Sequence, residues 1–396
     1  MNKAPATLLI ALVGVMTSGA VLSYSLSSAG PEIIERVQIT PGQLGGLASI
    51  SFVTAAVISF GLGRVADRIS IRAQFALIHL LTLAALVVAA FAQDYWMLCL
   101  AAVLVGPPLA ICNPTTNRVL LHSVPPEQRG SWVGIKQAGV QVAQFAVGLI
   151  FPAMVLAMGW VAAELVMAAA VVMLLVQGII AVRAHDHPPA TPVRKQPKGT
   201  GGLPASVWLL AVISMLGGFG MQASNVYLPT FAVHTLGYRL TVGGLTAAVV
   251  GGVGVVARVF WGRMTRFVPR PSILFLLIFG GATASGVSFI LATVTGIRTL
   301  LWVGAVLVGA ATLGTNVVVN ATIMQVVPVE RVGTASGLTS MFMYLGFAAG
   351  PFVMGLLRDL SGSFVWGWAT MTALYVGGFG VSLLLSTGGR TAEPSV

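Results

Sequence analysis

Apolar runs of about 20 residues recur along the whole chain, and short polar stretches separate them. A helix needs about 20 apolar residues to cross a hydrocarbon core of ~30 Å, so each run is long enough to span a membrane. Barrel strands would need only about 10 alternating residues. The pattern therefore predicts an all-α polytopic membrane protein with twelve transmembrane helices. Their ranges are 6–28, 43–63, 73–92, 96–120, 132–157, 161–182, 206–229, 242–262, 272–292, 300–324, 334–356 and 365–386.

The composition supports this interpretation. Lys and Arg number 21 and Asp and Glu 10, so that charged residues make up 8% of 396 residues, against about 25% in soluble domains. A soluble fold cannot cover its surface with so few charges, which excludes the soluble, disordered and fibrous classes. The first apolar run follows Lys3 like a signal peptide. It is too long for one, however, and eleven further runs follow, so we expect it to remain in the protein.

The net charge of +11 carries information about orientation. Basic residues lie in short gaps rather than on one clustered face, so no nucleic-acid partner is expected. If both termini are cytoplasmic, fourteen Lys and Arg residues lie inside and four outside, while Arg118, Lys136 and Arg258 fall within the predicted helices. This bias predicts a multi-pass protein of the cell (inner or plasma) membrane with both termini in the cytoplasm.

The sequence also divides into two related halves. Residues 183–204 form the longest polar stretch, which predicts six-helix units at 1–183 and 205–396 joined by a cytoplasmic linker at 184–204. Shifting residues 105–134 by 203 positions gives nine identities in thirty, among them Asn113 with Asn316 and Asn117 with Asn320. The same shift pairs Tyr24 with Tyr227. Parallel halves of this kind are one of the known transporter plans.

One loop motif connects these features to a known family. Residues 63–72 begin with Gly63, continue with Asp67 and Arg68, and end on Arg72; the second half carries a degraded copy at 262–266 without the acidic residue. With the twelve helices and the repeat, the whole chain resembles the major facilitator superfamily, in which this loop is a conformational gate. Orientation alone would explain the arginines but not Asp67. A carboxylate there can pair with basic residues and with a neighbouring helix terminus.

A second segment narrows the resemblance. Residues 256–262 are similar to the arginine segment of monocarboxylate and oxalate/formate porters, which implies that Arg258 binds a substrate carboxylate. Gly254 stands where those porters carry a nearby acidic residue, and snorkelling or a structural role for Arg258 remains open. Drug antiporters have a Gly-Pro-rich motif in the fifth helix. Here that pattern occurs at 346–351 instead, which weakens a drug-efflux interpretation.

Lys136 is the second candidate contact for an anion. It lies about 7.5 Å into its helix, counted from Ser131, and a charge at mid-membrane costs about 2.5–3.5 kcal/mol on insertion scales. Gln137, Gln141 and Gln144 share one face of the same helix. This polar stripe suits a water-filled cavity better than lipid. Snorkelling and a helix–helix pair are the alternatives for Lys136.

Further polar side chains within the predicted helices are candidates for lining the same cavity. Unpaired amides are costly in lipid, and the superfamily builds its cavity from the first, fourth, seventh and tenth helices. Hydrogen bonds between helices and interfacial packing would explain the same residues. Together with Lys136, Arg258, Gln137 and Gln141, the predicted substrate-binding residues are Asn113, Asn117, Asn316, Asn320, Tyr24, Tyr227 and Asn225.

Three other polar residues are expected to have structural roles. Arg118 lies near a helix end and can snorkel, His79 is predicted to pack with a hydrogen bond, and Glu164 is predicted to lie at the membrane interface. The coupling ion, a proton or a counter-ion, is therefore left open. The chain has no phosphate-binding loop, no metal-ligand spacing and no nucleophile elbow. We expect neither an enzyme nor a cofactor or metal site.

The function predicted from these features is secondary transport by alternating access. The expected partners are the lipid bilayer and a small-molecule substrate, an organic anion with a carboxylate favoured. An efflux carrier for hydrophobic or drug-like compounds is the alternative, which predicts a mostly apolar cavity with Lys136 and Arg258 at the membrane surface. A membrane sensor or scaffold is a third interpretation, which the glutamine stripe disfavours. A monomer is expected.

Overall fold

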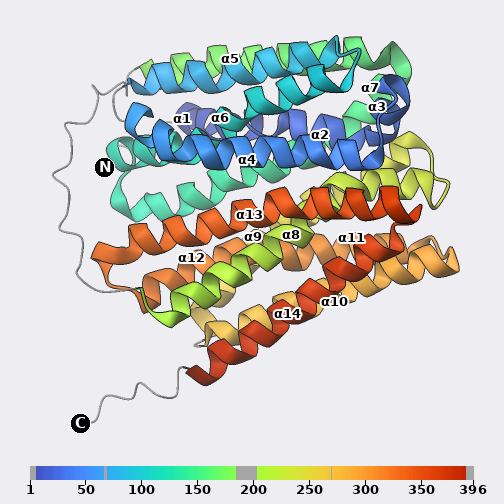
Figure 1. Cartoon of the computed structure of the whole chain (residues 1–396). Helices are drawn as coiled ribbons and strands as arrows, with labels where there is room; N and C mark the ends of the chain where they lie inside the picture. The colour runs from blue at the N-terminus through green and yellow to red at the C-terminus, as the bar shows by residue number, and fades with distance from the viewer. Residues whose placement is uncertain (1–5, 67–68, 184–202, 269, 389–396) are drawn as a thin grey trace.

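The computed structural model describes residues 6–66, 69–183, 203–268 and 270–388, and within them the regular structure is helical (Figure 1). In chain order the helices are α1 (Ala6–Ser18), α2 (Val21–Ser28), α3 (Gly30–Val37), α4 (Pro41–Ala66), α5 (Ile71–Ala90), α6 (Tyr95–Ser123), α7 (Pro126–Val182), α8 (Ala205–His234), α9 (Leu240–Phe267), α10 (Pro271–Thr295), α11 (Thr299–Ala311), the 3₁₀ helix η2 (Thr312–Gly314), α12 (Thr315–Val326), α13 (Val329–Ser361) and α14 (Val365–Gly388).

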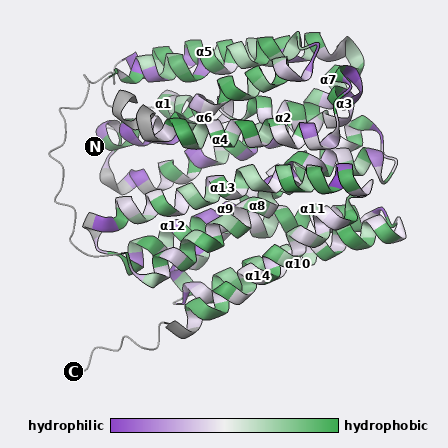
Figure 2. Cartoon of the chain, viewed as in Figure 1, coloured by the Kyte–Doolittle hydropathy of each residue, from purple (hydrophilic) through white to green (hydrophobic). Residues whose placement is uncertain are grey.

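Twelve membrane crossings follow from these helices, as the sequence predicts. In the part of the chain that the structure describes, eleven helical stretches are long and apolar enough to cross a membrane. One of them, within α7, is interrupted at Gly159, where φ is 81° and ψ 164°, so α7 contains two crossings. That φ lies in the left-handed region, which glycine adopts without a steric penalty. Apolar residues dominate the length of the helices, and hydrophilic ones gather mainly at the helix ends (Figure 2).

Two crossings are discontinuous. The first is divided at Gly19 and Ala20 into α1 and α2, and the tenth is divided by η2 into α11 and α12. Helix breaks at membrane depth are tolerated where the freed backbone is buried in protein or lines a cavity. Both breaks therefore point to the centre of the molecule as the place to search for a site.

Some helix starts are set by local capping. The side chain of Ser70 accepts a hydrogen bond from the backbone N–H of Ala73 at the start of α5, and Asp94 accepts one from Met97 at the start of α6. Such residues satisfy backbone donors that have no partner within the helix. The starts predicted from the apolar runs, at 73 and 96, agree with the observed starts of these two helices to within two residues.

Helices α1–α7 gather on one side of the molecule and α8–α14 on the other (Figure 1). The most extensive packing between the sides is that of α4 against α13 and of α7 against α9, and α2 and α3 also contact α8. Within the second side, α13 packs closely on α8 because of its glycines. A Cβ atom on Gly350 would lie 2.1 Å from the carbonyl oxygen of Phe219, so only glycine allows this approach. The Gly-Pro-rich pattern noted in the sequence is thus a packing surface for α8.

The predicted domain limits depend on the linker between the two six-helix units. Most of the predicted linker at 184–204 lies outside the described residues. The division into units at 1–183 and 205–396 stays a prediction.

Candidate functional site

A cavity of about 140 Å³ lies between the two sides of the molecule, at the level of the helix breaks. Gly19 and Ala20 of the first break line it, as do Thr312 and Leu313 of the second. Nine α-helices and the 3₁₀ helix η2 contribute in total. The polar side chains in the lining are Ser23, Tyr24, Asn113, Gln137, Gln141, Ser214, Gln222, Arg258, Thr312, Thr315, Asn316 and Tyr344.

Arg258 is the basic residue of this lining. Its side chain is partly buried, and its Nη1 donates one hydrogen bond of 3.1 Å to the backbone carbonyl of Gln137 across the α7–α9 contact. The Nε atom is buried without a hydrogen-bond partner. Among the described residues, no carboxylate forms an ion pair with this guanidinium. Arg258 therefore brings to the cavity a positive charge with unused donors, which suits a planar anion such as a carboxylate.

Gln141 is the least satisfied amide in the lining. Its side chain is 0% exposed, yet both Nε2 and Oε1 lack a hydrogen-bond partner in the described structure. A buried amide without partners costs free energy. The residue lies one helical turn from Gln137, the partner of Arg258, on the face of α7 that packs against α9. Gln141 and Arg258 thus place unused donors and an unused acceptor beside the same cavity.

Lys136 has a different environment. It is 0% exposed and absent from the cavity lining. Its Nζ donates to Thr116 Oγ1 at 2.6 Å, to Asn117 Oδ1 at 2.7 Å and to Asn113 Oδ1 at 3.4 Å, all on α6. The ammonium neither snorkels to the surface nor keeps a free proton donor. In this conformation it joins α6 to α7, and the anion contact predicted for it stays a prediction.

In each of the two asparagine pairs, one member lines the cavity and the other does not. Asn113 lines it and accepts a hydrogen bond of 2.7 Å from Gln137 Nε2, whereas Asn117 is exposed and bonded to Lys136. On α12, Asn316 lines the cavity, and the exposed Asn320 donates to its Oδ1 at 2.9 Å. In this conformation Asn320 is bonded to its pair member Asn316, Asn117 is bonded to Lys136, and the substrate contacts predicted for Asn117 and Asn320 stay predictions.

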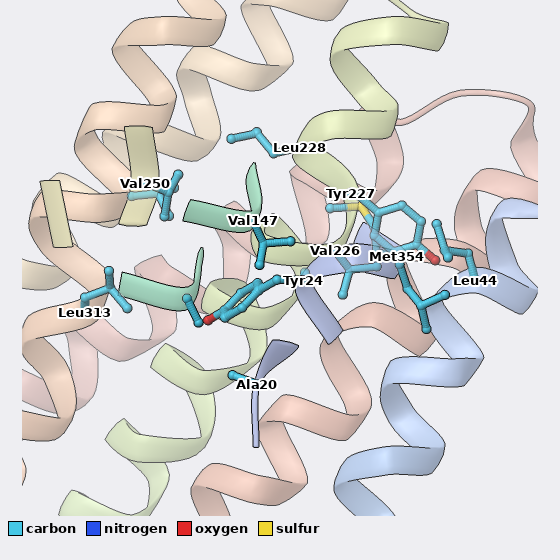
Figure 3. Packing of buried hydrophobic residues seen from close by; sticks show 14 of the residues in the cluster. Ala20, Tyr24, Leu44, Val147, Val226, Tyr227, Leu228, Val250, Leu313 and Met354 are labelled. Carbon is cyan, nitrogen blue, oxygen red and sulfur yellow. The ribbon is translucent and has the colours of Figure 1, made fainter. Parts of the chain in front are cut away.

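The paired tyrosines also differ. Tyr24 lines the cavity, and Figure 3 shows its hydroxyl directed toward the side of Leu313. Tyr227 lies on the side of Leu44 in the same view, and its hydroxyl donates a hydrogen bond of 2.7 Å to the carbonyl of Pro41. The structure thus brings Tyr24, but not Tyr227, to the cavity. The equivalence in sequence does not extend to the surroundings.

Asn225 lies beyond the cavity in a network that joins the two sides. Its Oδ1 accepts a hydrogen bond of 3.0 Å from Gln144 on α7, and its backbone carbonyl accepts one from the hydroxyl of Ser27 on α2. Its Nδ2 lies 3.5 Å from Oε1 of Gln222, which does line the cavity. Asn225 therefore connects the lining to the contact between the sides.

One end of the molecule is closed by further bonds between the sides. Asp359 at the end of α13 accepts hydrogen bonds from Thr40 Oγ1 at 2.6 Å and from the backbone N–H of Gly42 at 3.1 Å. Its carboxylate thus caps the first turn of α4, where the helix dipole favours a negative charge. We call this the closed end; α3 lies there in Figure 1. The hydrogen bonds between the sides described above, and that of Ser49 Oγ to the carbonyl of Ala348, lie between the closed end and the level of Arg258.

Of the predicted gate, Arg72 lies at the end opposite to the closed end. Asp67 and Arg68 fall outside the described residues, and Gly63 belongs to α4 in a stretch whose surroundings are not described. Arg72 donates a hydrogen bond of 2.8 Å to the backbone carbonyl of Arg183 at the end of α7. That contact lies within one side of the molecule. The gating role of all four residues stays a prediction.

An aromatic group in the lining was not predicted. Phe52 on α4 lies 5.0 Å from Phe347 and 6.3 Å from Tyr344 on α13, between ring centroids. All three line the cavity, together with Met16, Met221 and Met343. Apolar side chains inside membrane helices give no signal in the sequence, because the same residues face lipid elsewhere in the chain. The cavity therefore has a polar part at α7 and α9 and an apolar part at α4 and α13.

Three residues with predicted structural roles can also be placed. His79 is buried, and its Nδ1 donates a hydrogen bond of 2.7 Å to the carbonyl of Phe75, as expected for a packing residue. Arg118 donates from Nη1 to the carbonyl of Ile69. Glu164 is 0% exposed within the protein, with the hydroxyl of Ser25 2.7 Å from its Oε1, and its predicted depth at the membrane interface stays a prediction.

Comparison with known proteins identifies similar families and structures. The model of the Major Facilitator Superfamily matches residues 8–351. A bacterial homolog to the human lysosomal transporter Spinster, in an inward-facing and unoccupied conformation, has a TM-score of 0.76 at 16% identity over 100% of both chains. The nucleoside transporter NupG has a TM-score of 0.70 at 16% identity over 97% of this chain and 99% of its own. No curated relative matches by sequence. At these identities the two structures show the fold alone.

Proposed function

The chain belongs to the major facilitator superfamily and is a secondary transporter rather than an enzyme, and we propose that its substrate is a small organic anion, with a carboxylate as the favoured charged group. The observation that carries this proposal is Arg258, a cation in the lining of the central cavity with one hydrogen bond and no carboxylate partner among the described residues. The similarity of residues 256–262 to the carboxylate-binding segment of monocarboxylate and oxalate/formate porters supports it as an expectation.

Gln141 would supply the second contact. A carboxylate that accepts from Arg258 and from Gln141 Nε2 would satisfy donors that have no partner within the described residues. Asn113, Gln137, Asn316 and Tyr24 would add hydrogen bonds from the rest of the lining. Since an anion left in an apolar cavity would be strongly destabilised, such contacts decide which substrates enter. Lys136 is bonded to Asn113, which lines the cavity. Its positive charge would act on the anion across Asn113, without direct contact in this conformation.

Alternating access would operate between the two sides. At the closed end, Asp359 of α13 accepts a hydrogen bond from Thr40 before α4, and Ser27 donates one to the carbonyl of Asn225. These bonds have to break for the cavity to open there. With the orientation predicted by the basic residues, the closed end is the outer one and this conformation faces the cytoplasm. Gly63, Asp67, Arg68 and Arg72 would then close the inner end in the other conformation. Two units rocking about a central site are one of the known plans for such proteins.

A second candidate is efflux of hydrophobic or drug-like compounds. The specific observation in its favour is the apolar part of the lining, where Phe52, Tyr344 and Phe347 meet. This candidate also predicts basic residues that snorkel to the membrane surface. Lys136 does not snorkel, because its ammonium is enclosed between α6 and α7. The apolar part is also compatible with an anion that carries an apolar body, so the substrate panel has to contain both classes.

The test is uptake into proteoliposomes across monocarboxylates, dicarboxylates, sugar acids, inorganic anions and uncharged hydrophobic compounds, with and without a pH gradient. The parent protein is compared with Arg258→Gln and with Arg118→Gln as a matched control, because Arg118 lies outside the cavity lining. We expect uptake of an organic anion that is lost in Arg258→Gln and retained in Arg118→Gln. Uptake of uncharged compounds alone, equal in all three proteins, would contradict the anion proposal and favour the second candidate.

A further inference from the structure

Glu164 is a buried carboxyl group that the transport cavity does not use. It lies in the second crossing of α7 and is the sole titratable residue of that helix between Lys136 and its end at Val182. The side chain is 0% exposed. The hydroxyl of Ser25 on α2 lies within hydrogen-bond distance of its Oε1, at 2.7 Å, and its Oε2 is buried without a hydrogen-bond partner. An unneutralised carboxylate in such a place is very unfavourable.

None of the basic groups on the helices packed against α7 lies beside this carboxyl. Helix α1 has no titratable side chain. On α5, Arg72 bonds to the carbonyl of Arg183 and His79 lies beside Gly178, both toward the far end of the second crossing. On α9, Arg258 contacts the first crossing at Gln137.

The titratable groups described on α6 and α2 also lie away from the Glu164 carboxyl. On α6, Arg118 bonds to the carbonyl of Ile69, at the end opposite to Glu164, and Tyr95 lies near Gly46 of α4. On α2, the one titratable residue is Tyr24, which lines the cavity. Ser25 is therefore the side chain that responds to the charge state of Glu164.

The hydrogen bonds around Ser25 indicate which charge state this conformation holds. Its Oγ lies 2.7 Å from Glu164 Oε1 and 3.1 Å from the carbonyl oxygen of Leu22, but a serine hydroxyl has one proton. If Glu164 is protonated, it donates to Ser25 and Ser25 donates to Leu22, so both contacts are hydrogen bonds. If Glu164 is ionised, the serine proton serves the carboxylate and the Leu22 contact has none. The neutral acid is therefore the state that gives each of the two contacts a proton of its own.

Helix α2 connects this carboxyl to the cavity and to the contact between the two sides. Its eight residues follow the break at Gly19 and Ala20, so it is not continuous with α1. Tyr24 lines the cavity, Ser25 contacts Glu164, and Ser27 donates to the backbone carbonyl of Asn225 on the other side of the molecule. A displacement of α2 would alter the cavity, the surroundings of Glu164 and the contact between the sides together.

We propose that Glu164 is a proton-binding site whose occupancy is coupled to the position of α2, and that it is protonated in the conformation described here. When α2 separates from α7, water reaches the carboxyl, the O–H bond breaks, and the proton passes to water and leaves a hydrated carboxylate. The coupling ion of the transporter is then a proton. This proposal is independent of the substrate class, because nothing in it involves Arg258 or an anion.

The first measurement is infrared difference spectroscopy of the reconstituted protein during a pH titration. A protonated carboxyl has a C=O stretching band that a carboxylate lacks. We expect a band that titrates in the parent, is lost in Glu164→Gln, and shifts in frequency in Ser25→Ala, which keeps the carboxyl but removes its partner. Ser25→Ala keeps the test decisive if Glu164→Gln does not fold. A titrating band that is identical in the parent and in Ser25→Ala would overturn the proposal.

The second measurement follows conformation without any substrate. Spin labels at Trp96→Cys on α6 and Leu360→Cys on α13 report the separation of the two sides at the closed end, because both residues are 77% exposed there. Cys99→Ser and Cys112→Ala remove the native thiols. We expect the distance distribution of the parent to change with pH, and that of Glu164→Gln to remain in the low-pH form throughout. His79→Asn is the matched control at another buried titratable group.

In the control protein the pH dependence should persist, since the hydrogen bond of His79 goes to Phe75 on its own helix and not to α2. A pH-dependent distance that survives in Glu164→Gln, or that disappears in His79→Asn, would overturn the proposal. A parent distribution that does not change between low and high pH would overturn it as well. None of these results depends on whether the substrate is an anion, so a failure here is distinct from a failure of the proposed function.

Discussion

Lys136 and Arg258 are two cations within the membrane-spanning part of the chain, one in each half, and the sequence marks both as anion contacts. Their surroundings differ. Lys136 is completely buried, and three oxygen atoms of α6 accept from its ammonium. Arg258 is partly buried, has one hydrogen bond to a backbone carbonyl, and lines the cavity with its Nε unpaired.

The difference shows that charge and depth alone do not identify a ligand contact. A buried cation that already has a full set of acceptors contributes to the packing of its helices, because a ligand would have to displace those acceptors. A cation with unused donors beside a cavity gains hydrogen bonds when an anion arrives. The number of unsatisfied donors therefore distinguishes the two residues. This distinction can be tested directly.

The largest expected effect is that of Arg258→Gln. We expect the affinity for the anionic substrate to fall about 10- to 100-fold, because a hydrogen bond to a charged group contributes about 1.5–3 kcal/mol and 1.4 kcal/mol is a factor of ten. Arg258→Lys should be intermediate, since a lysine keeps the charge but not the planar fork. The measurement is the concentration dependence of uptake into proteoliposomes. Equal affinity in parent and Arg258→Gln would remove Arg258 from the site.

Lys136→Met should act mainly on stability. The substitution keeps an unbranched side chain but removes all three donors, so that Thr116 and Asn117 lose their hydrogen bonds to the ammonium. We expect the free energy of unfolding to fall by about 1–3 kcal/mol, the usual cost of leaving buried polar groups unpaired. Thermal unfolding in detergent measures this, and uptake should show a smaller loss of affinity than Arg258→Gln. A loss of affinity as large as that of Arg258→Gln would make Lys136 an anion contact, as the sequence predicts.

Gln141→Leu and Asn117→Leu form a matched pair with opposite expectations. Gln141 has no partner for either amide atom, so leucine should raise the free energy of unfolding by about 1 kcal/mol while lowering substrate affinity about fivefold, the equivalent of one neutral hydrogen bond. Asn117 is bonded to Lys136 and does not line the cavity, so leucine there should lower stability and leave affinity unchanged. The same two assays apply. The same sign of stability change in both variants would contradict the distinction.

Asp359→Asn should have the smallest effect and should not distinguish anions from neutral compounds. It weakens the charge interaction with the first turn of α4, which contributes about 0.3–1 kcal/mol, so the population open at the closed end should rise about two- to fivefold. Spin-label distances between Trp96→Cys and Leu360→Cys measure this shift. Affinities for all substrates should change by one common factor. A change confined to anions would mean that Asp359 acts on the charge at Arg258 rather than on conformation.

The fold was largely predictable from the sequence. The twelve predicted crossings correspond to the observed helices, including 132–157 and 161–182, which α7 joins across the bend at Gly159. The reason is physical: the length of an apolar run measures the thickness of the hydrocarbon core directly and needs no information about neighbours. The breaks at Gly19 and at Thr312–Gly314 were not predicted, since a run with a single broken turn has the same composition as an unbroken one.

The candidate site was only partly predictable. Polar residues within apolar runs stand out, and so Arg258, Gln137, Gln141, Asn113 and Asn316 were identified before the cavity was known to contain them. The aromatic part of the lining was missed, because a phenylalanine in a membrane helix has the same sequence context whether it faces lipid or a cavity. For that residue class, only the position of the neighbouring helices reveals which side it faces.

By itself, then, the sequence determined the class of protein, the crossings and a set of candidate polar residues, since those features depend on composition and on spacing along one helix. The tertiary structure decided which candidates are free to bind. It enclosed Lys136 between α6 and α7, opened Arg258 to the cavity, and buried Glu164 against Ser25. These outcomes depend on the rotation of each helix against its partners, which a single chain of letters does not contain.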